Sequence, residues 1–321
     1  MAHLLDTMAY AGETPWHGLG ATLDRGASID SWIRMSGLTW NAELQEIALA
    51  ASGTIIDGRK AVVRSDNGEV FGLVSDRYKP VQPRAVLEFF RDLAGSHSME
   101  IETAGSLKGG AVVWALATND AKITVKGSDV VKPYLLLSTS YDASQASRGC
   151  FTTVRVVCNN TLRMSYSADA EGVVNVRHTS KFDEKEVKAR LGIFSDQAET
   201  FADMANLLAE TRVTGSQVKA LLHELFGATN DAGELTTYSR NVMDKAASCI
   251  LTSPGSNLDS ARGTAWGVLN GITNYVDFHA RAHNGDNRLD SAWFGRGDAL
   301  KGDALNFLAG LNTRTRELIA A

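Results

Sequence analysis

The spacing of hydrophobic residues changes along the chain, and this change constrains the fold more than any single motif. Short apolar runs with strand character fill residues 40–137, and the turn sequence Ser-Asp-Asn-Gly at 65–68 joins two of them as a hairpin. A helical pattern at 82–93 interrupts these strands without a regular strand–helix alternation. After residue 179 the apolar residues recur with helical spacing, and this predicts helices at 183–211, 216–226, 239–251, 263–282 and 302–311. The turn-rich sequence Asn-Gly-Asp-Asn at 284–287 predicts a turn between the last two of these helices.

These patterns predict an α+β protein in three regions. Residues 1–39 form an N-terminal arm with a short helix that Ser28 caps, residues 40–180 a sheet-rich core with a mixed or antiparallel sheet and packed helices, and residues 181–321 a helical region. Within the arm, Trp16 and His17 stand between turn residues. One interpretation is that Trp16 anchors the arm to the core or to a neighbouring subunit. The alternative is that Trp16 or His17 belongs to a ligand site.

Composition narrows the class of protein. The chain has 321 residues and a formal net charge of −5, which disfavours coating of duplex DNA through bulk positive charge. Its three cysteines are widely spaced in apolar surroundings, as expected of reduced thiols in a cytosolic protein. The N-terminus lacks signal-peptide character and no run is long enough to cross a bilayer. We therefore expect a cytoplasmic protein with no membrane partner.

A β-branched run at 152–162 carries an arginine in its middle and ends in two asparagines before Thr-Leu. Read as one strand, it places Val154 and Cys158 on one face and Arg155 and Asn159 on the other. A buried strand rarely holds an unpaired charge, so the guanidinium should lie at a boundary where it meets a carboxylate or a phosphate.

The segments on either side of this run add hydroxyl groups, cations and aromatic rings. The hydroxyl-rich stretch 138–149 can donate to phosphate oxygens, although Asp142 can instead pair with Arg148 or Arg155. The interval 140–190 has two more basic than acidic residues and interleaved aromatic rings, a combination that single-stranded nucleic acid uses. A solvated charged face is the alternative for its lysines. The candidate nucleic-acid ligands are Arg148, Arg155, Arg163, Arg177 and Lys181.

Two histidines, His279 and His283, are four residues apart in a predicted helix, so both would project from one face as metal ligands require. Asp277 is poorly placed as a third ligand, and Ala280 stands where helical zinc peptidases carry a glutamate. We therefore predict no metal site and no cofactor, with this pair as the weak candidate.

Together, Trp16-His-Gly-Leu-Gly, Tyr78-Lys-Pro-Val-Gln and the 152–162 run resemble the phage/plasmid-like protein family, whose shared domain is of unknown function. The resemblance covers about residues 16–283 and implies a cytoplasmic protein of phages, prophages or plasmids, without implying catalytic residues. The order of a strand-rich module and then helices is also similar, as an analogy of fold pattern, to ring-forming single-strand annealing proteins.

Three functions follow as hypotheses. The first is a non-enzymatic, homo-oligomeric factor that binds single-stranded DNA or anneals strands in recombination, with the arginines holding phosphates. The second is an oligomeric structural or host-interaction protein, such as a counter-defence factor, that contacts host or phage proteins. The third is a metal-dependent hydrolase or nuclease, which would depend on His279 and His283.

Overall fold

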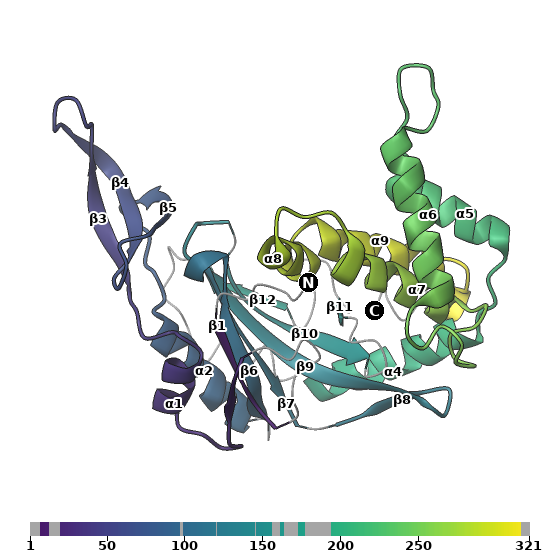
Figure 1. Cartoon of the computed structure of the whole chain (residues 1–321). Helices are drawn as coiled ribbons and strands as arrows, with labels where there is room; N and C mark the ends of the chain where they lie inside the picture. The colour runs from purple at the N-terminus through teal and green to yellow at the C-terminus, as the bar shows by residue number, and fades with distance from the viewer. Residues whose placement is uncertain are drawn as a thin grey trace.

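The fold is an α+β arrangement of one large sheet, one small sheet and a group of C-terminal helices (Figure 1). The computed structural model describes residues 7–12, 20–96, 99–119, 121–144, 146–155, 161–163, 173–176 and 194–315. The predicted fold class is confirmed.

The large sheet has nine strands, seven of them in the order β11-β10-β9-β7-β6-β1-β2, with β12 paired to β10 and β8 paired to β9. All of its pairings are antiparallel except β1 with β2. The strands are β1 Thr7–Ala11, β2 Ala21–Leu23, β6 Glu100–Leu107, β7 Val112–Thr118, β8 Ile123–Val125, β9 Asp129–Ser140, β10 Ser147–Arg155, β11 Thr161–Arg163 and β12 Val173–Val176.

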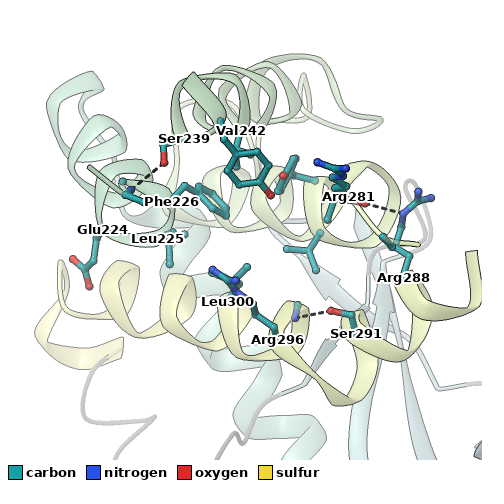
Figure 2. A pocket seen from close by; sticks show the side chains of 18 residues that line it. Glu224, Leu225, Phe226, Ser239, Val242, Arg281, Arg288, Ser291, Arg296 and Leu300 are labelled. Atoms are coloured by element: carbon teal, nitrogen blue, oxygen red, sulfur yellow. Dashed lines mark hydrogen bonds between the residues drawn. The ribbon is translucent and has the colours of Figure 1, made fainter. Parts of the chain in front are cut away.

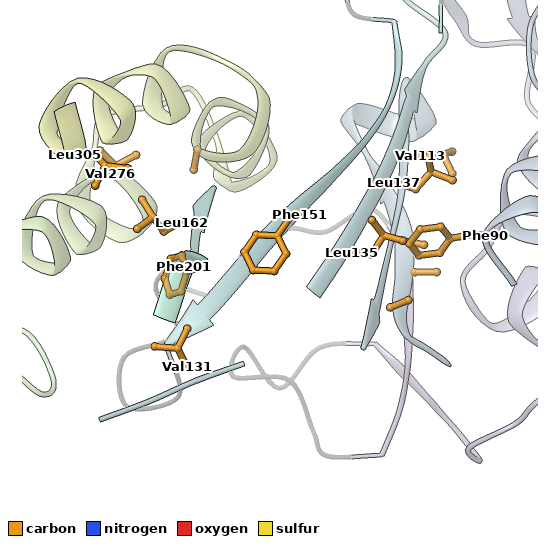
Figure 3. Close-up of a cluster of buried hydrophobic side chains, with 14 of the residues drawn as sticks. Phe90, Val113, Val131, Leu135, Leu137, Phe151, Leu162, Phe201, Val276 and Leu305 are labelled. Atoms are coloured by element: carbon orange, nitrogen blue, oxygen red, sulfur yellow. The ribbon is translucent and has the colours of Figure 1, made fainter. Parts of the chain in front are cut away.

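The central strands are buried on both faces, which explains their continuous apolar sequences. In β7, Val113 and Ala115 point into one hydrophobic cluster, while Trp114 and Leu116 point into another. The first cluster runs from helix α2 (Pro83–Ser96) across the sheet to the C-terminal helices (Figure 3). The second is closed by Trp293, whose ring lies edge-on to Trp114 at 5.0 Å.

The short helix α1 (Ile29–Met35) begins as predicted, with the Ser28 side chain accepting a hydrogen bond from the Ser31 amide. The predicted hairpin forms as β4 (Ile55–Arg64) and β5 (Val70–Ser75), which β3 (Ala42–Ala48) extends to a three-stranded sheet. Strands β3 and β4 project from the body as a ribbon (Figure 1). The short 3-10 helix η1 (Lys108–Gly110) joins β6 to β7.

The C-terminal region is helical, as predicted. Its elements are α4 Phe194–Glu210, α5 Gly215–Phe226, α6 Thr237–Thr252, α7 Ala265–Asn274, the π-helix η2 Tyr275–His279, α8 Gly285–Phe294 and α9 Arg296–Ala309. These helices share the main hydrophobic core with the sheet. Asp129 at the start of β9 adds a polar link, because its buried carboxylate accepts from Ser260 Oγ at 2.7 Å and from Trp266 Nε1 at 2.9 Å. The three-region division stays a prediction.

Two expectations about local structure are wrong. The segment at 284–287 is not a turn, since Asn284 caps α8 by accepting from the Asn287 amide. The run at 152–162 is not one strand, because Thr153 in β10 pairs with Leu162 in β11 in antiparallel register. The apolar period is the same on both sides of a chain reversal, so periodicity could not reveal it.

Candidate functional site

The candidate site is a cavity of about 420 Å³ among the C-terminal helices, which we call the arginine cavity. Its walls come from the end of α5, the start of α6, η2 and the residues after it, α8 and the start of α9 (Figure 2). Arg281, Arg288 and Arg296 all line it, with Glu224 as the acidic residue of the lining.

Each arginine reaches the cavity from a different element. Arg281 follows η2, Arg288 lies on α8 and Arg296 is the first residue of α9. Arg288 is half-buried, and its Nε donates to the Ala280 carbonyl oxygen at 3.0 Å, which fixes the side chain. Arg281 and Arg296 are exposed. Within the described part of the chain, none of the three forms an ion pair, so their positive charge is available to an anion.

Close packing sets the position of Arg296. The next residue is Gly297, and a Cβ there would lie 2.8 Å from Val276 Cγ1 and 2.9 Å from the Ser291 carbonyl oxygen. Its amide also donates to Ser291 Oγ at 3.1 Å. Only glycine lets the start of α9 approach η2 and α8 this closely.

Aromatic rings form another part of the wall. Phe226 and Tyr275 pack edge-to-face with centroids 5.4 Å apart, and Tyr238 is 60% exposed. Burial, followed by the nearby Tyr238 and Cys249, raises the pKa of Tyr275, so its hydroxyl stays protonated. The cavity thus joins cationic groups to π surfaces, a pairing suited to a phosphate next to a base.

A buried polar cluster lies behind the cavity. Lys301 Nζ on α9 donates to Asp277 Oδ1 at 3.0 Å and to the Thr161 carbonyl oxygen at 2.9 Å. Asp277 Oδ2 in turn accepts from the Thr161 amide at 2.8 Å. The Lys301 and Asp277 side chains are almost fully buried. The cluster therefore ties η2 and α9, which line the cavity, to strand β11 of the large sheet.

The predicted one-face arrangement of His279 and His283 is wrong, because η2 ends at His279 and Ala280 is extended, at φ −57° and ψ 139°. Burial, then the positive charges of Lys245 and Arg288, lowers the pKa of His279. Among the residues that the structure describes, no group of three potential metal ligands occurs.

The predicted nucleic-acid residues lie largely beyond what the structure describes. Arg148 lines a separate hollow of about 320 Å³ together with Asp298 and Asp303, whose carboxylates make it a poorer phosphate surface. Arg155 belongs to β10 and Arg163 to β11, but the structure does not describe their side chains. Four further residues lie wholly outside the described residues: Arg177, Lys181, Trp16 and His17.

Sequence reasoning missed the three cavity arginines. Arg288 and Arg296 are eight residues apart on two helices, and the region around Arg288 was expected to be partly turn. No spacing rule for one helix or one strand connects them. The available signal was an excess of arginine over lysine across 281–296.

A sequence model of the family described as "Domain of unknown function (DUF932)" matches residues 70–293, more than half of the chain. The chain belongs to the DUF932 family. The matched range contains β5, the central strands, and every arginine of the cavity except Arg296. No curated protein and no solved structure was found to match the chain. In the described part, no helix has both the length and the apolar character needed to cross a membrane.

Proposed function

We propose that this DUF932 protein is a non-enzymatic factor that binds single-stranded DNA, encoded by a phage or another mobile element and used in recombination. The observation that carries the proposal is the arginine cavity, where three arginines without ion-pair partners in the described chain line the same cavity as Phe226 and Tyr275. Guanidinium groups bind phosphate oxygens through paired donors, and aromatic rings stack on bases of any sequence.

The overall negative charge of the chain fits a local site better than a duplex-coating surface. Arg281 and Arg296 are exposed, so the basic side of the cavity faces solvent and is open to a phosphate chain. The arginines first predicted, Arg148, Arg155, Arg163, Arg177 and Lys181, remain candidates for a continuing path along the sheet.

Replacing Arg281 or Arg296 by alanine should weaken binding to an oligonucleotide of about 40 nucleotides without unfolding the protein, because neither side chain has a hydrogen bond to a described residue. Each lost phosphate contact should reduce the slope of log K against log salt by about 0.7. Fluorescence polarisation across a salt series measures both effects.

The control is Arg34→Ala, which removes the same charge from the exposed face of α1, far from the cavity in Figure 1. Equal losses in the control and the cavity variants would show that bulk charge, rather than the cavity, binds the strand. No binding of the wild-type protein at low salt would exclude the proposal.

A second candidate function is assembly as an oligomeric structural or host-interaction protein. The projecting ribbon favours it, because Leu49 and Ile55 near its tip are 53% and 51% exposed, and Leu73 on β5 is 61% exposed. Apolar side chains gathered on a protruding element are typical of protein contacts. A second copy of this chain is the partner that we propose for the ribbon.

A further inference from the structure

Resting on the proposed function, we infer that the arginine cavity holds one terminal nucleotide whose phosphate is a monoester. The source of this unit is either the end of a strand or a free nucleoside monophosphate, because both present the same chemistry. Three features of the cavity support the inference: its cation count, its size and the acidic residues at one side.

The cation count favours a monoester over an internal diester. Arg281, Arg288 and Arg296 bring three guanidinium groups to one cavity, without carboxylate partners in the described residues. A monoester carries a charge of about −1.5 to −2 at neutral pH and offers three acceptor oxygens, whereas a diester carries one charge. The higher charge of the monoester matches three guanidinium groups in one cavity more fully.

The size and layout suit one nucleotide. A volume of about 420 Å³ lies toward the lower end of the range for small-ligand pockets, roughly 300–1,000 Å³. Figure 2 shows Arg281 and Arg288 on one side and Phe226 on the opposite side, with Arg296 between them. A phosphate on the arginine side therefore leaves its base next to Phe226 and Tyr275, whose rings are in contact.

Acidic residues oppose continuation of a strand beyond the aromatic side. A neighbouring hollow of about 380 Å³ shares Glu224, Leu225 and Leu300 with the cavity and is also lined by Asp303. Two carboxylates along this direction would repel the next phosphate of a continuous strand. The chain must then leave the cavity by the basic, solvent-facing side, so the nucleotide inside is a terminal one.

The test compares three thymidine oligomers of about 12 nucleotides by fluorescence polarisation, with a 5′-phosphate, a 3′-phosphate or hydroxyl groups at both ends. One phosphorylated oligomer should bind at least about tenfold more tightly than the hydroxyl form, and the preference should disappear in Arg281→Ala and Arg296→Ala but persist in Arg34→Ala. Tyr238→Ala, at an exposed ring, should weaken binding by about tenfold.

Competition separates the two sources. The four common deoxynucleoside monophosphates are tested one at a time as competitors. If at least one of them displaces the labelled oligomer as well as an unlabelled phosphorylated strand does, the source is the free nucleotide. If all four displace it more weakly, the source is a strand end. Equal binding of all three oligomers without competition by any monophosphate would overturn the inference and leave single-strand binding intact. Failure of every oligomer and every nucleotide to bind would overturn both.

Discussion

The ion pair between Asp277 and Lys301 joins two elements that line the arginine cavity, η2 and α9, to each other and to Thr161 of β11. Both side chains are almost fully buried, and the Lys301 ammonium group donates to Asp277 Oδ1 and to the carbonyl and hydroxyl oxygens of Thr161. Two buried charges are tolerated only when they satisfy each other and their remaining hydrogen bonds. The sequence could not predict this pair, because its members are 24 residues apart and lie on separate elements.

Lys301→Met should lower the free energy of unfolding by about 3–5 kcal/mol, since it leaves the Asp277 carboxylate buried without its cation. Chemical denaturation measures the change. Arg84→Met is the matched control, because Arg84 pairs with Asp30 and Glu88 at the surface, where solvent screens the charges and the loss of stability should be small. A loss in Lys301→Met no larger than in the control would contradict the importance of the buried pair.

Local signals in the sequence predicted several helices and strands correctly. Helix α2, the β4–β5 hairpin and helix α5 all form where apolar spacing and turn residues placed them. Helix α8 was missed because Asn284 and Gly285 are typical of turns as well as of a capped helix start. Tertiary packing decides whether such a segment forms a turn or starts a helix, and the sequence of one chain does not show this packing.

The ribbon of β3 and β4 is the element for which we propose a contact with a second copy of this chain. Leu49→Asp combined with Ile55→Asp should lower the mass of the assembled protein in light scattering, because charges at a buried contact oppose association. Leu251→Asp is the control, since Leu251 is 77% exposed on α6, away from the ribbon. A wild-type monomer, or equal masses for all variants, would exclude the ribbon as an assembly contact.

In the whole molecule, the large sheet supports the C-terminal helices that line the arginine cavity. The main core joins the large sheet to α4, α7 and α9, while Asp129 and Asp277 each hold a helical segment against a strand by hydrogen bonds. The arginine cavity arises only when α5, α6, α8 and α9 pack together. Sequence patterns predicted those helices in part, but the cavity depends on how they meet.

Photocross-linking tests single-strand binding in the arginine cavity, because it locates the bound strand on the protein. A thymidine oligomer with terminal 5-iododeoxyuridine should cross-link, under ultraviolet light, to peptides that contain Phe226 or Tyr238, because these two rings line the cavity and are accessible to a base. Mass spectrometry identifies the peptides, and Arg281→Ala should reduce the yield. Cross-links confined to the ribbon or to the β10–β11 strands, with none in the cavity, would contradict single-strand binding at this site.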